Sequence, residues 1–262
     1  MQRDPKSHKG ENGKVAVIGG SKTMHGAPIL SALAAEASGA DLIFLCLPAC
    51  HCEAAKNASL NFQVYPFFGD DLAPKDTEAI LELLATMDAA VIGPGVSHAH
   101  AESVKAILNV IAEAPCSLVL DASALQPQTL SLVRQKNAVL TPHLAEMERM
   151  GIVAKDLERM AEEYGATIVL KGAEDRIAFP DGSITTVSGG NVGLTAGGTG
   201  DALAGLIAGL IAQHMSVPEA CVTAATIMKR AATDLFSEYG YAFGAKRVIE
   251  HIPHLLHAMS AE

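Results

Sequence analysis

The chain has 262 residues, of which 49% are hydrophobic and 18% are charged, and this composition excludes an intrinsically disordered protein. A formal net charge of −10 and a sequence pI of about 5.4 exclude a general nucleic-acid-binding face, because a phosphate backbone requires a basic surface. Five cysteines without a disulfide framework, a polar start over residues 1–14 and no apolar run long enough to span a bilayer predict a cytoplasmic protein without a signal peptide or membrane contact.

The first half of the chain alternates apolar runs with helical segments. The runs are continuous, which is typical of parallel strands that are buried on both faces of a sheet. We predict strands over 14–19, 41–47, 88–92, 117–120 and 138–140. Helices are expected from about 27 to 38 and from about 99 to 114.

The pattern changes in the second half. A strand is predicted over 167–170, and two more, over 176–179 and 184–187, flank the turn sequence Pro180-Asp181-Gly182. The remainder indicates helices over about 201–213, 217–238 and 245–258. No linker divides the chain, so we predict one α/β domain over residues 1–262, with a mostly parallel central sheet and a late antiparallel hairpin at one edge.

Glycine or functional polar residues follow five of the predicted strands. In a parallel sheet the ligand binds outside the carboxyl ends of the strands, so these residues are expected to meet in one site. They are Gly19–Ser21, Gly93–Gly95, Asp121, Thr141–His143 and Lys171–Gly172.

A glycine loop, Gly197 to Gly200, stands directly before Asp201 and an apolar helix. The first turn of a helix has unpaired N–H groups and a partial positive charge, and glycines allow an anion to approach the backbone. We therefore predict that the loop binds a nucleotide phosphate and that Asp201 removes a proton from an attacking hydroxyl. Alternatively, the glycines form only a tight turn and Asp201 caps the helix. The loop lacks the lysine of a Walker P-loop.

The stretch from Asn191 to Gly205 resembles the signature of the ADP/ATP-dependent NAD(P)H-hydrate dehydratases, which belong to the ribokinase-like superfamily. The Gly-Thr-Gly-Asp element marks only the superfamily, whereas Thr-Pro-His-x-x-Glu and Gly-Asn-x-Gly together are more specific. Other matches follow in the same order over nearly the whole chain: His8–Gly10, Gly13, Gly19–Ser21, Gly26–Ala27, Gly93–Gly95, Asp121–Leu125, Leu140–His143, Glu146 and Leu170–Gly172. The resemblance implies a single-domain, three-layer ribokinase-like sandwich.

The resemblance also implies an activity, the repair of a hydrated nicotinamide cofactor. NAD(P)H hydrate would be returned to NADH or NADPH at the expense of ADP or ATP. Hydroxide is a poor leaving group, but phosphorylation of the ring hydroxyl makes it a good one, and the ring nitrogen can then expel phosphate. A kinase fold would thereby perform a net dehydration.

By the same resemblance, individual residues acquire roles. Asp201 is the implied base and contacts the hydrated cofactor, and Gly198, Thr199 and Gly200 form the anion hole. Binding of the adenine nucleotide is implied for Lys171, Gly172, Ala173, Glu174, Asp175 and Gly200.

The implied contacts of the hydrated cofactor beyond Asp201 are Ala27, Gly95 and His143. Glu146 follows His143 by three residues, and related sugar kinases use an acid at this position to organise Mg²⁺ through water. Relatives assemble as tetramers, so a homo-oligomer is expected. Each assignment has a simpler rival: Lys171 as an ordinary strand-end cation, His143 as a helix cap and Asp121 as a turn residue.

Three departures from the family pattern concern residues that line the site. Ser123 stands where the family has a second aspartate, and Ser97 stands where it often has glycine. The family tends to carry a histidine where this chain reads Ile227–Arg230. Pocket-lining positions set specificity, so substrate choice depends on them. Many relatives also carry a fused epimerase domain, for which we expect no residues here.

Two other functions remain open from the sequence. A small-molecule kinase of the same superfamily, acting on a vitamin precursor or a sugar, would share the glycine loop. A regulatory protein that binds nucleotide without catalysis would have no use for Asp201. The Thr-Pro-His element at His143 and the Asn191-x-Gly193 element favour the dehydratase.

Overall fold

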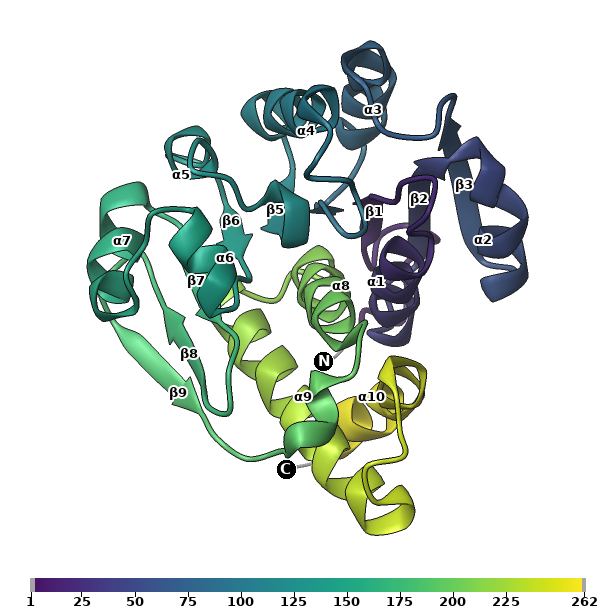
Figure 1. Ribbon diagram of the computed structural model, residues 1–262. Coiled ribbons are helices and arrows are strands. Elements are labelled where there is room, and N and C mark those ends of the chain that lie inside the picture. The colour runs from purple at the N-terminus through teal and green to yellow at the C-terminus, as the bar shows by residue number, and fades with distance from the viewer. Residues whose placement is uncertain (1–2, 261–262) are drawn as a thin grey trace.

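A computed structural model describes residues 3–260 of the chain. Its centre is a nine-stranded sheet in the order β3-β2-β1-β4-β5-β6-β7-β8-β9 (Figure 1). The neighbours from β3 to β7 pair in parallel, and β8 and β9 continue the sheet with antiparallel pairing. The strands are β1 (Lys14–Ile18), β2 (Leu42–Pro48), β3 (Phe62–Phe67), β4 (Ala89–Ile92), β5 (Ser117–Leu120), β6 (Ala138–Leu140), β7 (Thr167–Leu170), β8 (Asp175–Ala178) and β9 (Ile184–Val187).

Helices cover both faces of this sheet and complete the predicted three layers. One face packs against α1 (Gly26–Ala37), α8 (Thr199–Ala212), α9 (Val217–Tyr239) and α10 (Ala245–Met259). The other packs against α3 (Thr77–Leu84), α4 (Ala101–Glu113), α5 (Thr129–Leu132), α6 (Leu144–Arg149) and α7 (Leu157–Tyr164). Near β3 lies α2 (Cys52–Ala58).

Successive residues of a strand point to opposite faces, and β1 shows why its apolar run is continuous. Val15 and Val17 are buried in the layer that contains α8, whereas Ala16 and Ile18 are buried in the opposite layer. Both faces are therefore dry, as expected of parallel strands.

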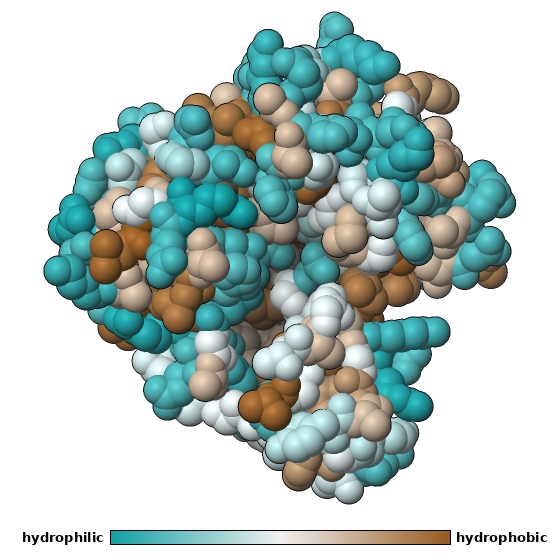
Figure 2. All heavy atoms as spheres, in the orientation of Figure 1, coloured by the Kyte–Doolittle hydropathy of each residue, from teal (hydrophilic) through white to brown (hydrophobic). Residues whose placement is uncertain are grey.

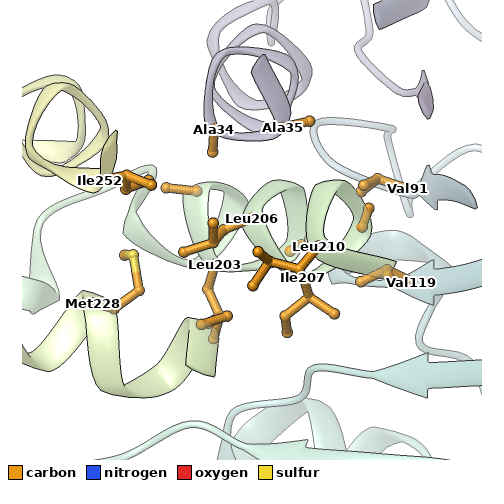
Figure 3. Packing of buried hydrophobic residues seen from close by; sticks show 14 of the residues in the cluster. Ala34, Ala35, Val91, Val119, Leu203, Leu206, Ile207, Leu210, Met228 and Ile252 are labelled. Carbon is orange, nitrogen blue, oxygen red and sulfur yellow. The ribbon is translucent and has the colours of Figure 1, made fainter. Parts of the chain in front are cut away.

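Helix α8 runs through the centre of one layer, where it packs on the sheet with α1 and α9 as neighbours (Figure 3). Its close approach to α1 depends on glycine. A Cβ built on Gly205 would lie 2.0 Å from the carbonyl oxygen of Ser31, and one on Gly209 would lie 2.1 Å from Oγ of Ser38. The small residues of α8 thus set the distance between the two helices, and with it the position of the loop before α8.

The predicted elements are all present, with small shifts at their ends. Helix α8 begins at Thr199, two residues earlier than expected, and α4 begins at Ala101. No sequence pattern predicted β3, α2, α3, α5 or α7, and α6 was foreseen only as a helix start capped by His143. Strand β3 contains Pro66, which is tolerated because β3 forms an edge of the sheet. Over residues 3–260, no helix has the length and apolar character needed to cross a bilayer.

Candidate active site

The glycine loop is held in a single conformation at the start of α8. Oγ1 of Thr199 donates to the carbonyl oxygens of Leu194 (2.6 Å) and Ala196 (3.0 Å). Gly198 has φ +94°, and a Cβ there would lie 2.3 Å from Cδ1 of Leu30. Only glycine satisfies both the positive φ and this contact, so the loop can present its amide groups and the first turn of α8 to a ligand.

Asp201 lies in the first turn of α8 and is partly buried. Burial, together with the nearby charges of Asp121 and Glu146, raises the pKa of Asp201 to about 7, although Lys171 acts in the opposite direction. A carboxyl group with such a pKa can accept a proton near neutral pH and release it again. The backbone of this turn is fixed by α1, because Oγ of Ser31 donates to the carbonyl oxygen of Asp201 (2.9 Å).

A partly buried lysine connects three strand ends next to Asp201. Nζ of Lys171 lies 2.7 Å from Oδ1 of Asp121 and 3.6 Å from Oε2 of Glu146. Oγ1 of Thr141 donates to the same Asp121 oxygen (2.9 Å). Burial lowers the pKa of Lys171, but Asp121 and Glu146 outweigh it, so the net shift is upward and the lysine stays charged. One cation therefore faces three carboxylates, including Asp201.

His143 and Glu146 form a capping box at the start of α6. The backbone N–H of His143 donates to Oε2 of Glu146 (2.8 Å), and the N–H of Glu146 donates to Nδ1 of His143 (3.2 Å). The predicted helix cap is thus confirmed. The cap uses only Nδ1 of the His143 side chain, which remains 54% exposed. The cap also turns the buried carboxylate of Glu146 toward Lys171.

The carboxylates of this site could hold Mg²⁺ only indirectly, through water molecules and substrate phosphates. Among the residues that the structure describes, no three His, Cys, Asp or Glu side chains cluster closely enough to hold a metal ion. Mg²⁺ keeps several waters in proteins and binds through one or two carboxylates together with phosphates. Glu146, which is buried but lies beside Lys171, fits such an indirect role.

A second part of the site surrounds Gly95. A Cβ on Gly95 would lie 3.3 Å from Cβ of Ala27, which places these two predicted substrate contacts side by side. Gly95 also lines a cavity of about 610 Å³ together with Ser97 and Ser123. Oγ of Ser123 donates to the carbonyl oxygen of Val96, so this serine faces the backbone of the neighbouring loop.

Helix α1 connects the two parts. Ala27 and Ser31 are four residues apart on the same side of α1, and Ser31 holds Asp201. From Asp201 the contacts continue through Lys171 to Glu146 and His143. The face of the molecule that carries these loops is hollowed near its centre, in front of α8 (Figure 2).

The loop between β7 and β8 carries the remaining predicted residues. Oδ1 of Asp175 accepts from the N–H of Gly172 (2.9 Å), and Oγ of Ser188 donates to Oε1 of Glu174 (2.8 Å). Nζ of Lys229, from α9, donates to the carbonyl oxygens of Gly172 (2.7 Å) and Ala173 (2.9 Å).

Asp121 was expected at the site as a strand-end group, but its pairing with Lys171 was not predicted. Lys229 had no predicted role. Lys229 stands on a buried face of α9 between Ala225 and Ala232. A lysine within an apolar helical stripe indicates a buried, paired cation, and this pattern was visible in the sequence.

Comparison with known proteins agrees with this geometry. A family model for NAD(P)H-hydrate dehydratases matches residues 15–254. The chain is 37% identical over 236 residues to the ADP-dependent (S)-NAD(P)H-hydrate dehydratase of Nitrosopumilus maritimus, which corresponds to 86% of this chain and 82% of that protein. It is 38% identical to the bifunctional NAD(P)H-hydrate repair enzyme Nnr of Methanocaldococcus jannaschii, of which it spans 50% while 97% of this chain is covered.

Solved structures lead to the same family. The ADP/ATP-dependent NAD(P)H-hydrate dehydratase from Bacillus subtilis, co-crystallized with ATP/Mg²⁺, matches with a TM-score of 0.83 and 26% identity over 98% of this chain and 93% of that chain. A hydroxyethylthiazole kinase from Pyrococcus horikoshii, with a TM-score of 0.62 and 16% identity over 94% of this chain and 89% of that chain, shares only the fold. The predicted family and fold are therefore confirmed, and the chain belongs to the NAD(P)H-hydrate dehydratase family with a ribokinase-like fold.

Proposed function

We propose that this protein returns hydrated NADH and NADPH to the intact cofactors at the expense of ADP or ATP, with Asp201 as the base. The observation that carries the proposal is the partly buried carboxyl group of Asp201, with a pKa of about 7, in the first turn of α8. The relative from N. maritimus is named ADP-dependent, and the B. subtilis protein was co-crystallized with ATP/Mg²⁺, which supports a nucleotide as co-substrate.

The reaction consists of phosphoryl transfer followed by elimination. Asp201 accepts the proton of the ring hydroxyl while the hydroxyl oxygen attacks the terminal phosphorus of the nucleotide. The phosphoanhydride bond then breaks and releases AMP from ADP or ADP from ATP. The ring nitrogen lone pair then expels inorganic phosphate. Loss of a proton from the neighbouring ring carbon restores the dihydropyridine, so water is removed overall and one phosphoanhydride is hydrolysed.

Charge in the transition state is stabilised by the start of α8. The amides of Gly198, Thr199 and Gly200 would face the transferred phosphoryl group, because the first N–H groups of a helix have no partner within it. The N–H of Thr199 makes only a long bond of 3.4 Å, to the carbonyl oxygen of Ala196 before the helix. Lys171 supplies a charged donor beside them. A Cβ on Gly200 would lie only 3.3 Å from Nζ of Lys171, so the two groups border the same space.

The nucleotide would extend from this point along Gly172, Ala173 and Glu174, with Asp175 supporting that loop from within. A polyphosphate would add negative charge to a site in which Lys171 already faces Asp121, Glu146 and Asp201. This imbalance supports a requirement for Mg²⁺, with Glu146 acting through water.

The hydrated nicotinamide ring would lie toward Ala27, Gly95 and His143. Helix α1 and the Lys171–Glu146 contact link these residues to the turn that carries Asp201, which supports a ring hydroxyl placed between them and the carboxylate. We further propose a cytoplasmic homo-oligomer. Exposed apolar side chains such as Leu60 (98%) and Phe68 (76%) support an interface between copies, and light scattering coupled to size exclusion measures it.

The test is to supply hydrated NADH or NADPH with ADP or ATP and Mg²⁺ and to follow the return of dihydronicotinamide absorbance together with phosphate release. We expect the two signals to rise in a one-to-one ratio. A stable phosphorylated product without recovered absorbance would identify a small-molecule kinase instead. Nucleotide binding without either signal would identify a regulatory protein.

A further inference from the structure

Lys229 is a buried cation at the back of the β7–β8 loop. Only 5% of the residue is exposed, although it lies in the middle of the 23-residue helix α9. Its ammonium donates to the carbonyl oxygens of Gly172 (2.7 Å) and Ala173 (2.9 Å) and lies 3.4 Å from Oδ1 of Asp175. All three donors of the ammonium are therefore used within one short loop.

These contacts determine which way the peptide groups of the loop face. In a trans peptide the C=O and N–H point in opposite directions, and no cis peptide occurs in the described chain. Because the carbonyls of Gly172 and Ala173 point at Lys229, the N–H groups of Ala173 and Glu174 point away from it. Within residues 3–260, no hydrogen bond involves either N–H group. Two successive N–H groups directed to one side form a site for an anion.

Lys229 also contacts the segment that leads to the glycine loop. A Cβ on Gly190 would lie 3.0 Å from Cδ of Lys229, so the backbone there packs directly on the lysine stem. Ser188, two residues earlier, holds the side chain of Glu174. One side chain thus lies between the β7–β8 loop and the segment that continues to Asn191 and the start of α8.

We propose that Lys229 is a positioning residue for the nucleotide: it holds two carbonyls inward so that the N–H groups of Ala173 and Glu174 bind the phosphate oxygens. The inference rests on the proposed function, since it assumes that ADP or ATP binds at this loop. The ammonium pairs with Asp175, so the carboxylate of Asp175 acts from behind the loop and does not touch the nucleotide. The positive charge also polarises the two peptide groups, which strengthens their N–H groups as donors.

The first experiment compares Lys229→Met and Lys229→Arg with the wild type. Methionine keeps most of the stem but removes the donors, whereas arginine keeps a charged donor. For Lys229→Met we expect the Kd of ADP, measured by calorimetry, and the KM of the nucleotide to rise at least tenfold. The kcat at saturating nucleotide should stay within threefold of the wild type, because the reacting atoms are not touched. Lys229→Arg should recover at least part of the affinity.

Leu235→Ala provides the matched control. Leu235 is a buried residue of the same helix, and none of the hydrogen bonds and ion pairs that hold the β7–β8 loop involves it, so its truncation should loosen α9 and leave those bonds in place. We expect a lower Tm with an unchanged KM for nucleotide. An equal rise in KM for Leu235→Ala and Lys229→Met at similar losses of Tm would overturn the positioning role.

A measurement on the wild type keeps the inference testable even if Lys229→Met does not fold. Addition of ADP should slow hydrogen exchange at the amides of Ala173 and Glu174 at least tenfold. Bound ADP with unchanged exchange at both amides, or native affinity in Lys229→Met, would overturn the inference while leaving the proposed function intact. A wild-type protein that neither binds nucleotide nor repairs the hydrate would instead refute the proposed function.

Discussion

The ammonium of Lys171 lies 2.7 Å from the carboxylate of Asp121, and the two residues stand at the ends of β7 and β5, on either side of β6. This pair borders Asp201, whose pKa responds to both charges in opposite directions. The protonation of the proposed base is therefore controlled by residues 30 or more positions away in the chain, and that control can be measured.

The pH dependence of kcat/KM should reveal the proposed base. Asp201 must be deprotonated to accept a proton, so kcat/KM should fall tenfold per pH unit below a pKa of about 7. Lys171→Met removes the charge that lowers this pKa, so the acidic limb of the profile, the fall of kcat/KM toward low pH, should move to higher pH. Asp121→Asn removes a charge that raises it and should move the limb to lower pH. Limbs that move in the same direction in both variants would contradict this electrostatic model.

Replacement of Asp201 by asparagine should reduce kcat at least a thousandfold. The isosteric amide cannot accept the hydroxyl proton, while the start of α8 and the loop after β7 remain to bind nucleotide. We expect the Kd of ADP to change less than fivefold by calorimetry. Asp181→Asn, in the exposed turn of the β8–β9 hairpin, serves as the control and should retain wild-type kcat. Retention of wild-type kcat by Asp201→Asn would show that Asp201 only caps the helix.

The same substitution should make the protein more stable at alkaline pH. The pKa of Asp201 is about 7 in the folded state and 3.8 as its reference value, so the folded state binds the proton more tightly. The wild type therefore loses stability as the pH rises from about 4 to about 7. At about 1.4 kcal/mol per pKa unit, and allowing for screening of a partly exposed side chain, Asp201→Asn should gain about 2 kcal/mol at pH 8.

Denaturant titrations at about pH 3 and about pH 8 measure this effect. The difference between Asp201→Asn and the wild type should nearly vanish at the lower pH, which lies below the reference pKa of 3.8, so that Asp201 is neutral in both the folded and the unfolded state. An equal difference at both pH values would show that the carboxylate is not destabilised by its surroundings.

Two glycines of the glycine loop should respond differently to replacement by alanine: one in nucleotide affinity, the other in stability. Gly200 lies inside α8, where alanine is favoured, and the nearest atom to its Cβ would be Nζ at the flexible end of Lys171, at 3.3 Å, with Oδ2 of Asp121 at 4.0 Å. Gly200→Ala should thus keep its stability within about 1 kcal/mol but bind nucleotide at least fivefold more weakly, because the methyl group occupies the approach to the helix. Gly198→Ala should lose about 2 kcal/mol or more, since its φ is +94° and Leu30 is 2.3 Å away. Thermal unfolding and calorimetry separate the two effects.

The contact between α1 and α8 should tolerate no added methyl group. In Gly205→Ala the new Cβ would overlap the carbonyl oxygen of Ser31, so the helices must separate, at a cost of about 3 kcal/mol or more. Activity should fall as well, because Ser31 holds the backbone of Asp201. Gly244→Ala, where no atom lies within 4 Å of the new Cβ, should change stability by less than about 1 kcal/mol. Similar Tm values for the two variants would show that the helices are not in the predicted contact.

Much of the fold could be predicted because its physics is local. A strand that is buried on both faces must be apolar at successive positions, as Val15, Ala16, Val17 and Ile18 are, and a run of such strands separated by helices implies a parallel sheet. Strand β3 was missed because Pro66 and polar neighbours mask its pattern, and an edge strand needs only one apolar face. The glycine loop was visible because Gly198 and Asp201 lie in one short segment.

The sequence by itself determined the parallel sheet, the glycine loop and the acid that follows it, since each depends on neighbours along the chain. The tertiary structure alone decided that Lys171 pairs with Asp121, that Lys229 holds the carbonyls of Gly172 and Ala173, and that Asp201 has a pKa of about 7. The reason is that a side chain's charge state depends on its burial and on every charge near it in space, and folding brings those groups together from segments that are far apart in the chain.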